Sequence, residues 1–424
     1  MTITRRDFTR LFAVGGSAAL FVHPEFAAAR PAPLPAAGVA AGDAFWDSVR
    51  EQFVMPPGLA VINAANLCPS SRPVLEAMYG NTRDIDQDPS PNNRAKFNGT
   101  KEETRKRLAA FLRVTPDEII LARNTSEANN LVSSGLDLKA GDEVLIFHDN
   151  HPSNNQAWKE KAKRFGYTVT ELPSPNPHPG ADYYVNAVQK AITPRTKVLA
   201  FTHLTSTVGD LMPAAELCRI ARERGVLTLL DGAQSFGLID VDLAAIQPDF
   251  YTGSAHKWPC GPKEAGVLFV SRRVHDRIWP SIYSAYTGAT GLSKTFEGFG
   301  QRDDATIIAL GETLAFQEKV GRANIEKRAR ELTQQLLAGL KKIDGITVWT
   351  SPVPERNLAV VSFQPGSLNP SKLSTALYEK DRIACATRGG SDRGGLRFSP
   401  HFYNTPQEID RALAALTRYM KTGV

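Results

Sequence analysis

A lysine and an aspartate are the residues of this sequence best suited to chemistry. Lys257 lies in the loop Thr252-Gly253-Ser254-Ala255-His256-Lys257-Trp258, among small and aromatic residues that can shield its amine from water. Desolvation lowers the pKa of a lysine and makes its neutral amine a nucleophile toward an aldehyde. Asp231 directly follows the apolar run Leu227 to Leu230, so its carboxylate needs a cationic partner or several hydrogen bonds. A protonated pyridine nitrogen is such a partner, and the charged ring would then accept electrons from a carbanion.

Each of these two residues alone has a plainer interpretation. A single lysine is most often a surface residue, and an aspartate after a strand is as readily a helix cap or a Mg²⁺ ligand. The pairing of Asp231 with the Ser-x-His-Lys loop, each close to an apolar run, favours the chemical interpretation.

Hydroxyl side chains close to two of the apolar runs suit a phosphate group. Thr125 and Ser126 come after the run Ile119 to Ala122, at the start of a predicted helix where free backbone N–H groups attract anions. Ser254 and His256 belong to the lysine loop. Thr125 or Ser126 alone is more often a plain N-cap.

A histidine and an arginine, His151 and Arg397, are the last two candidate site residues of this group. His151 lies in Asp149-Asn150-His151-Pro152-Ser153-Asn154, after the run Val144 to Phe147. A lone histidine there is a structural residue about as often as a functional one. Arg397 lies in the stretch Leu396 to Thr405, and its guanidinium suits a two-pronged bond to a carboxylate, whereas its plain alternative is a surface salt bridge.

The elements that would position these residues alternate between short apolar runs and helix-like segments. The runs of strand length are 118–121, 144–147, 198–201, 227–230 and 267–270, and the helix-like segments are 125–136, 155–165 and 214–224. This alternation predicts an α/β fold with a mainly parallel sheet and helices on both faces. Such sheets bind ligands beyond the carboxyl ends of their strands, where the polar clusters stand.

The pattern changes near Asp304. One long helix over 305–342, strands over 347–350 and 359–363 and a helix over 371–380 predict a smaller C-terminal α+β domain. The expected domains are therefore a signal peptide at 1–29, an N-terminal arm at 30–60, a large domain at 61–303 and a small domain at 304–424.

The N-terminus carries an export signal. Thr4-Arg5-Arg6-Asp7-Phe8-Thr9-Arg10 precedes an apolar run from Leu11 to Val22 and the small residues Ala27 to Ala29. The paired arginines resemble a twin-arginine (Tat) signal, which predicts a periplasmic protein that meets the twin-arginine translocase during export. The alternative is an uncleaved anchor, but the apolar run is short for a membrane span. Because Tat substrates are exported folded, the signal favours a protein that carries a cofactor.

The distribution of charge and the spacing of the cysteines argue against two classes of ligand, nucleic acids and metals. A formal charge of +6 and a pI near 9.0 arise from scattered basic residues without a basic stripe, so no nucleic-acid partner is expected. The four cysteines are far apart and form no CxxC motif, which argues against a zinc or iron–sulfur site, and no metal is expected. The spacing is still compatible with one disulfide bond between two of these cysteines.

Together these motifs resemble the fold type I enzymes that use pyridoxal 5'-phosphate (PLP), in the class V aminotransferase family and its isopenicillin N epimerase-like branch. The resemblance covers roughly residues 61–419. It implies that Lys257 binds PLP covalently, that Asp231 pairs with the pyridine nitrogen, and that Gln234 bonds the ring hydroxyl. It further implies that His151 stacks on the ring and that Arg397 holds the substrate carboxylate. The phosphate would be held by Thr125, Ser126, Ser254 and His256.

Departures from the family pattern separate the branches. The stretch Ala386 to Asp392 lacks the nucleophilic cysteine of the cysteine desulfurases, and Cys385 lies upstream of it, so desulfurase chemistry is not expected. Thr205-Ser206 also differs from the usual Ser-Asn, and His401 fits the epimerase-like proteins. Gln301 stands where many relatives have a threonine that reaches the partner subunit's phosphate. The resemblance implies a homodimer with shared active sites, in which Gln301 would donate that hydrogen bond.

The predicted function is therefore PLP-dependent chemistry at the Cα of an amino acid or of a peptidic molecule with a free amino acid group. With its Tat signal, the chain is similar to the periplasmic PLP enzymes that modify the glutamate side group of the siderophore pyoverdine. The alternatives are a small-molecule aminotransferase, an epimerase or a cysteine lyase, and, from another class, a PLP-binding carrier or sensor without turnover.

Overall fold

The computed structural model describes Leu34 and residues 42–176, 179–285, 291–389 and 392–424. The expected signal peptide lies outside the described residues, as does most of the first part of the expected arm. Among the helices of the described ranges, none combines the length and apolarity needed to cross a membrane.

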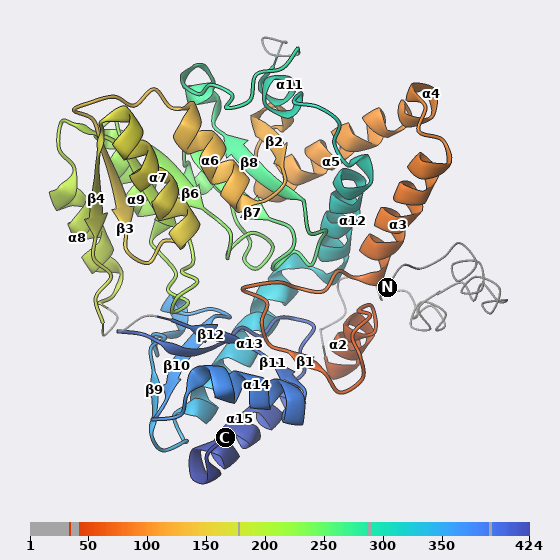
Figure 1. Cartoon of the computed structure of the whole chain (residues 1–424), viewed down its shortest axis with the longest axis vertical. Coiled ribbons are helices and arrows are strands. Elements are labelled where there is room, and N and C mark those ends of the chain that lie inside the picture. Colours follow the sequence, from red (N-terminus) through yellow and green to blue (C-terminus); the bar gives the residue numbers. More distant parts are fainter. Residues whose placement is uncertain (1–33, 35–41, 177–178, 286–290, 390–391) are drawn as a thin grey trace, which may run out of the picture. The chain divides into compact units, whose positions relative to one another are not determined.

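A seven-stranded sheet forms the large half of the described chain (Figure 1). Its strands, in spatial order, are β2 (Ile119–Ala122), β8 (Gly266–Val270), β7 (Phe250–Ser254), β6 (Leu227–Asp231), β5 (Thr196–Thr202), β3 (Glu143–Phe147) and β4 (Thr168–Leu172). Strands β7, β6, β5, β3 and β4 are parallel, and β8 runs antiparallel to both β2 and β7. The predicted mainly parallel sheet is confirmed.

Two strands of this sheet were not predicted. Strand β4 lies at the sheet edge with most of its residues partly exposed, so it lacks the continuous apolar run of a buried strand. Strand β7 is fully buried, but its sequence Phe-Tyr-Thr-Gly-Ser is polar at its carboxyl end. The five predicted strands are all present within two residues of their predicted bounds.

Helices cover both faces of the large sheet, as predicted. Helices α6 (Thr125–Gly135) and α7 (Pro152–Phe165) share one apolar core with the strands, and α8 (Ala181–Ala191) and α9 (Ala214–Glu223) share the other. The positions predicted for α6, α7 and α9 are confirmed. Shorter helices are α2 (Asp43–Arg50), α4 (Pro91–Arg94), α10 (Leu243–Ile246) and α11 (Leu292–Glu297), with 3₁₀ turns at Pro116–Glu118, Arg272–Arg277 and Pro354–Arg356.

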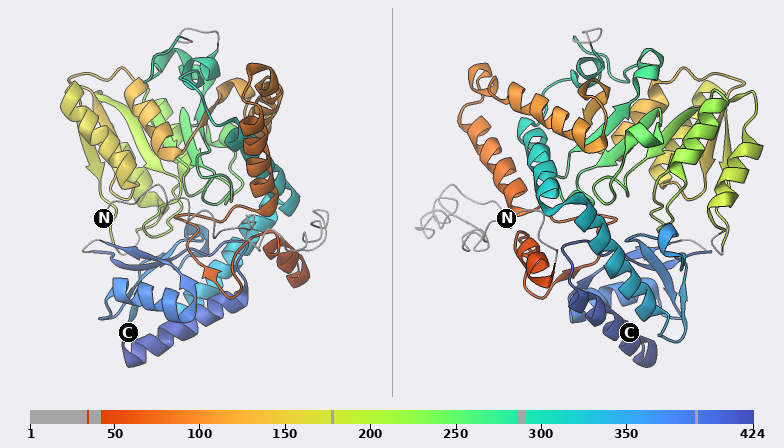
Figure 2. Two further views of the ribbon diagram at one scale, coloured as in Figure 1. Left: turned by 45° about the vertical axis from the view of Figure 1, so that its right-hand side comes forward. Right: turned by 180° about the vertical axis from the view of Figure 1, so that it is seen from behind.

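The prediction of one long helix over 305–342 is wrong. Gly321, with φ +91°, divides it into α12 (Asp304–Val320) and α13 (Arg322–Leu340). Helix α12 packs against α3 (Arg72–Gln87) and α5 (Phe97–Leu112), as Figure 2 shows from behind. Helix α13 instead packs against α15 (Pro406–Thr422). The two halves of the expected helix therefore pack against different helices. The domain boundary at 303/304 stays a prediction.

A second sheet is small and antiparallel, with the order β12 (Ala386–Arg388), β13 (Gly395–Phe398), β10 (Val361–Pro365) and β9 (Ile346–Val348). Its apolar side chains form a core with those of α13, α14 (Pro370–Asp381) and α15. The short strand β1 (Ala60–Val61) pairs in parallel with β11 (Ile383–Ala384), which ties the N-terminal arm to this part of the chain. The smaller α+β half predicted from the sequence is present.

Candidate active site

Asp231 stands at the carboxyl end of β6 and is 1% exposed. Its Oδ2 accepts hydrogen bonds from the side-chain amides of Asn129 (2.8 Å) and Asn154 (3.3 Å), and its Oδ1 accepts one from the backbone N–H of Ala233 (3.0 Å). All three donors are neutral, and no cationic side chain of the described ranges forms an ion pair with Asp231. A buried carboxylate held only by neutral donors can still accept a cationic partner.

Lys257 lies in the loop that follows β7, with its side chain largely buried. Burial lowers the pKa of its amine to about 8; the nearby charge of Arg397 adds to this effect and that of Asp231 opposes it. A lysine with this pKa is far more often neutral near pH 7 than an exposed one, and the neutral amine is the nucleophilic form. The site therefore prepares Lys257 for covalent bonding to an aldehyde.

The next residue, Trp258, fixes the lysine loop from three sides. Its indole N–H donates to Gln234 Oε1 (2.7 Å), and its carbonyl accepts hydrogen bonds from His401 Nε2 (2.6 Å) and Gln317 Nε2 (2.9 Å). The ring of His401 also contacts the Trp258 ring edge-on, with centroids 5.0 Å apart. Burial lowers the pKa of His401 to about 3, so its imidazole is neutral and the Nε2 that faces the Trp258 carbonyl is the protonated nitrogen.

Thr125 and Ser254 meet at the N-terminus of α6. The backbone N–H of Thr125 donates to Ser254 Oγ (2.8 Å), and the two hydroxyl oxygens are also 2.8 Å apart. Ser126, the next residue, contacts Ser153 through its hydroxyl (3.2 Å). The structure thus joins hydroxyls from two predicted clusters at a helix N-terminus, where an anion is favoured.

His256, next to Lys257 in the lysine loop, donates its Nδ1 proton to the Lys263 carbonyl (3.1 Å). Burial lowers the pKa of His256 to about 4, so the ring is neutral in the absence of a ligand and its Nε2 carries a lone pair. A bound phosphate would raise this pKa because a nearby negative charge stabilises the imidazolium.

His151 is the N-cap of α7, and its Nδ1 accepts from the backbone N–H of Ser153 (3.2 Å). Its pKa is lowered by burial and by the charges of Lys257, Arg388 and Arg397, whereas Asp231 raises it. These electrostatic effects place His151 in one site with Lys257 and Asp231. A neutral imidazole has a flat face that can stack on an aromatic ring.

Arg397 enters the site from β13 of the small sheet and is 5% exposed. Its Nη1 donates to the carbonyl of Ser206 (3.1 Å), and its pKa is lowered to about 10 by burial and by the charge of Arg388. The Arg397 guanidinium makes no ion pair with a carboxylate of the described ranges, which leaves its charge free for an anionic ligand.

The two predicted glutamines lie in different places. Gln234 is buried, its Nε2 donates to the Ala65 carbonyl (3.0 Å), and its Oε1 accepts from Trp258, the residue after Lys257. Gln301 is exposed, and its Oε1 accepts from Arg94 Nη2 (2.6 Å) near the start of α12. Within one chain Gln301 is therefore a surface residue beside Arg94, and its role toward a partner subunit stays a prediction.

Sequence reasoning missed several residues of the site. Asn129 lies one helical turn after Thr125, so helical spacing from the phosphate cluster was an available signal for it. Arg393 forms a buried ion pair with Asp149, with both guanidinium–carboxylate distances at 2.7 Å. No sequence signal pointed to that pair, because its members are 244 residues apart.

PLP fits the groups that converge here. Asp231 would face the pyridine nitrogen, Lys257 the aldehyde carbon, and Thr125, Ser254 and His256 the phosphate. The burial of Lys257, which lowers the pKa of its amine, and the neutral hydrogen-bond donors of Asp231 support this fit. Lys257, Asp231, His151 and Arg397 thus come together in space from separate parts of the chain, whereas Gln301 does not join them.

Comparison with known proteins agrees with this geometry. The model of the family described as aminotransferase class-V matches residues 71–412. An isopenicillin N epimerase of Streptomyces clavuligerus is 32% identical over 392 residues, which cover 88% of this chain and 98% of that protein. A cysteine desulfurase of Thermococcus onnurineus, solved in its apo form, has a TM-score of 0.80 and 23% identity, with 88% of this chain and 98% of that one covered. A variant of the protein C-DES with glycine covalently linked to its PLP cofactor also has a TM-score of 0.80, at 23% identity and with coverages of 87% and 98%.

Proposed function

Because the chain belongs to the class V aminotransferase family of fold type I PLP enzymes, we propose that it acts at the Cα of an amino acid group within a peptidic molecule, after export to the periplasm. The predictions of family, enzyme class and cofactor are confirmed. The observation that carries the proposal is the convergence of Lys257, Asp231 and Arg397 on one site from three separate strands or loops.

The chain's own residues divide the work of such a reaction. When bound, PLP supplies a ring that accepts electrons released at Cα. Arg397 orients the substrate by its carboxylate, and Lys257 Nζ is the base for the Cα proton, since its lowered pKa lets the amine accept a proton near neutral pH. The buried carboxylate of Asp231 would keep the pyridine nitrogen of bound PLP protonated by charge attraction. His151, whose lowered pKa favours the neutral imidazole, would cover one face of the ring without adding charge.

For the substrate we propose the glutamate side group of the siderophore pyoverdine. The support is the stretch Thr4 to Arg10, which resembles the signals that direct folded proteins to the periplasm, together with the absence of a desulfurase cysteine from the stretch Ala386 to Asp392. The test is to incubate the purified protein with a pyoverdine precursor that carries this side group. Mass spectrometry should show a changed side group with the wild type and none with Lys257→Ala. Unchanged precursor, alongside turnover of free amino acids, would refute the siderophore assignment.

Epimerisation is the second candidate, because the identity of 32% to an isopenicillin N epimerase extends over 88% of the chain. The two outcomes differ at Cα. An epimerase exchanges the Cα hydrogen in D₂O and interconverts two stereoisomers with no other change in mass, whereas a tailoring reaction alters the side group itself. Chiral chromatography of the same incubation separates them.

We also propose that the enzyme is a homodimer that meets the twin-arginine translocase before reaching the periplasm. Exposed apolar side chains at Trp279 (61%) and Tyr283 (69%) support a partner surface near the loop that precedes α11. Light scattering of the purified protein should give twice the chain mass. A monomer with full activity would refute the shared-site dimer.

A further inference from the structure

The buried ends of two neighbouring strands bring Asp231 and Thr252 side by side. Strands β6 and β7 are parallel, and their register pairs Asp231 with Thr252. Side chains of residues paired in this way point to the same face of a sheet. Asp231 is 1% exposed and Thr252 is 0% exposed, so both side chains need hydrogen-bond partners within the protein.

Asn129 of helix α6 supplies a partner to both of these side chains. Its Nδ2 donates to Asp231 Oδ2 (2.8 Å), and its Oδ1 accepts from Thr252 Oγ1 (2.9 Å). An ionised carboxylate can only accept hydrogen bonds, so the amide nitrogen faces Asp231 and the amide oxygen faces Thr252. The Thr252 hydroxyl is therefore the donor, and it fixes the orientation of the Asn129 side chain.

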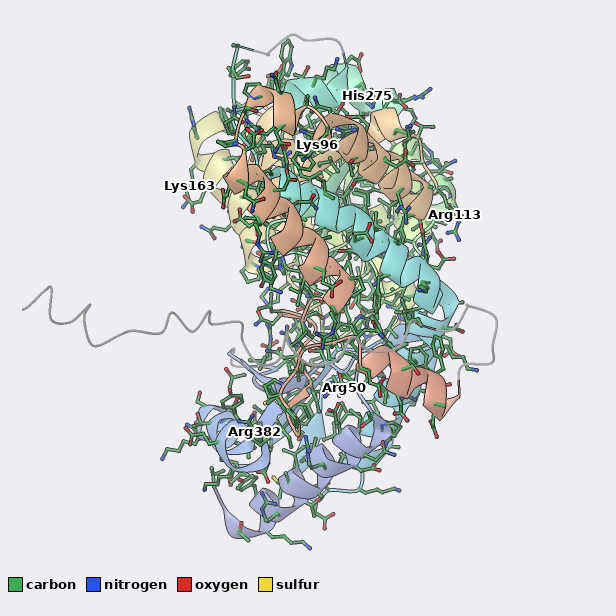
Figure 3. The ribbon with its side chains drawn as sticks, turned by 90° about the vertical axis from the view of Figure 1, so that its right-hand side faces the viewer. Arg50, Lys96, Arg113, Lys163, His275 and Arg382 are labelled. Carbon is green, nitrogen blue, oxygen red and sulfur yellow. The ribbon has the colours of Figure 1, made fainter. Side chains whose placement is uncertain are left out.

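A second amide reaches the same carboxylate oxygen from helix α7. Asn154 Nδ2 donates to Asp231 Oδ2 (3.3 Å), and its Oδ1 accepts from the indole N–H of Trp158 (3.1 Å). Because an indole N–H can only donate, the orientation of this amide is fixed as well. Asn154 lies on the inner face of α7, whereas Lys163, about two and a half turns later, is exposed on the outer face (Figure 3).

Helix α6 contacts strand β7 at two successive positions. Thr125, four residues before Asn129, contacts Ser254, which lies two residues after Thr252. Four residues of a helix rise about 6 Å and two residues of a strand about 7 Å, so both contacts form along the same two elements. The helix thus connects the hydroxyl pair suited to a phosphate with the carboxylate suited to a ring nitrogen.

The hydrogen bonds of Asp231 leave one of its oxygens with spare accepting capacity. An ionised carboxylate can accept about four hydrogen bonds, two at each oxygen. Oδ2 accepts from Asn129 and Asn154, whereas Oδ1 accepts only from the backbone N–H of Ala233 (3.0 Å) among the described residues. Oδ1 is therefore the oxygen that can accept from a further donor.

We propose that Asn129 is a positioning residue for the cofactor: oriented by Thr252, it occupies Oδ2 of Asp231 and so leaves Oδ1 for the pyridine nitrogen of PLP. Loss of the Asn129 amide frees the carboxylate to turn about its Cβ–Cγ bond, which weakens its attraction to a group held at a fixed place. This inference rests on the proposed function only in that PLP is the cofactor, and it applies whichever substrate the enzyme uses.

The test compares PLP with its deaza analogue, in which a C–H group replaces the ring nitrogen. Both molecules have the aldehyde and the phosphate, but only PLP can donate a hydrogen bond from the ring nitrogen to Asp231. Equilibrium dialysis of the whole cofactor-free chain gives a Kd for each, and the ratio of the two isolates the contribution of the nitrogen. We expect the wild type to bind PLP at least about tenfold more tightly, as for a hydrogen bond between charged groups.

Variants at two positions test the role of the amide. Asn129→Leu keeps the branching of the side chain but has no donor, so the preference for PLP should fall by about fivefold to tenfold, with less than about a twofold change for the deaza analogue. Thr252→Val removes the donor that orients Asn129 and should lower the preference by about threefold. Thr252→Ser keeps the hydroxyl and should resemble the wild type, so a folding defect in one variant does not decide the result.

The matched control is the next residue of the same helix. Asn130 is exposed, and its Nδ2 donates to the Ser126 carbonyl (2.9 Å) rather than to Asp231, so Asn130→Leu should leave the ratio unchanged. Nuclear magnetic resonance of PLP with an isotope-labelled ring nitrogen gives a second readout in the loaded protein. The resonance should indicate a protonated nitrogen in the wild type and in Asn130→Leu, and should shift toward the neutral form in Asn129→Leu.

Two results in Asn129→Leu would overturn the inference. One is a ratio equal to that of the wild type. The other is a parallel loss of affinity for PLP and the deaza analogue, which would give Asn129 a structural role only. No substrate takes part in these measurements, so failure of the siderophore assignment would leave them unaffected. A wild type that does not bind PLP would overturn the cofactor assignment and this inference together.

Discussion

At the large-sheet end of the site the carboxylate and hydroxyl groups have protein partners, whereas at the small-sheet end two buried guanidinium groups have hydrogen bonds through only some of their nitrogens. Asp231 accepts three hydrogen bonds, and Thr125 and Ser254 bond each other. Arg388 and Arg397 instead retain buried Nε groups without partners in the described ranges. A cofactor that stays bound suits a preformed site, while a substrate that comes and goes can supply the missing partners itself. The difference supports the proposed division, in which the large sheet holds PLP and Arg397 of the small sheet holds the substrate carboxylate.

The strongest test of the cofactor end is removal of its amine. Lys257→Ala should abolish covalent attachment of PLP and with it all turnover, because no other amine occupies this position in the lysine loop. The measurement is the visible spectrum of the purified protein before and after borohydride. Borohydride should fix the cofactor on the wild type and not on the variant. A wild-type protein that stays colourless after incubation with PLP would contradict the assignment of a PLP site to the large sheet.

Asp231→Asn tests whether the charge at this end matters beyond its hydrogen bonds. Asparagine has the same shape and can still accept from Asn129, but it no longer stabilises a proton on the ring nitrogen. We expect the kcat to fall by about a hundredfold to a thousandfold, with PLP still bound. Steady-state kinetics and the cofactor content measure the two effects separately. A kcat close to that of the wild type would show that the carboxylate has only a structural role.

The ion pair between Asp149 and Arg393 joins the two ends, and breaking it should lower stability. Asp149→Asn leaves the buried Arg393 guanidinium with only the exposed Asp392 as a counter-charge, so we expect a loss of about 3 kcal/mol in the free energy of unfolding. Urea denaturation measures it. The exposed pair of Arg272 and Asp117 is the control, and Asp117→Asn should cost less than about 1 kcal/mol. Equal losses in the two variants would mean that the buried pair does not hold the ends together.

The smallest expected effect concerns pH. Burial lowers the pKa of Lys257 to about 8, so the neutral amine is the major form above that pH. From pH 8 to pH 6 its fraction falls from about one half to about one in a hundred, and capture of PLP by the cofactor-free protein should slow in proportion. Stopped-flow absorbance measures the rate. A rate that keeps rising up to pH 10 would indicate an ordinary lysine.

The lowered pKa of Lys257 also makes the free energy of unfolding depend on pH. Because the folded pKa of Lys257 is lower than its ordinary value of 10.5, the unfolded chain binds more protons between about pH 8 and 10.5. Stability of the cofactor-free protein should therefore rise with pH in that window, and Lys257→Ala should remove this contribution.

Much of the fold could be predicted because the signals are local. Buried strands such as β5 and β6 are continuous apolar runs, and α6 and α9 show helical spacing between them. The predictions failed where tertiary packing outweighed local pattern. Strand β7 is buried despite its polar end, and Gly321 ends α12 although both flanking segments favour a helix.

The sequence by itself determined which residue types follow the strands, and hence a helix start with two hydroxyl residues, an aspartate and a lysine, in that order along the chain. Only the tertiary structure decided which groups neutralise one another. Asn129 and Asn154 reach Asp231 from 102 and 77 residues away, and Arg393 reaches Asp149 from 244 residues away. The reason is physical: charge and hydrogen bonding depend on distance in space, which no local pattern encodes. The position of Arg397, which donates from the small sheet to the Ser206 carbonyl in the loop after β5, likewise depends on both sheets.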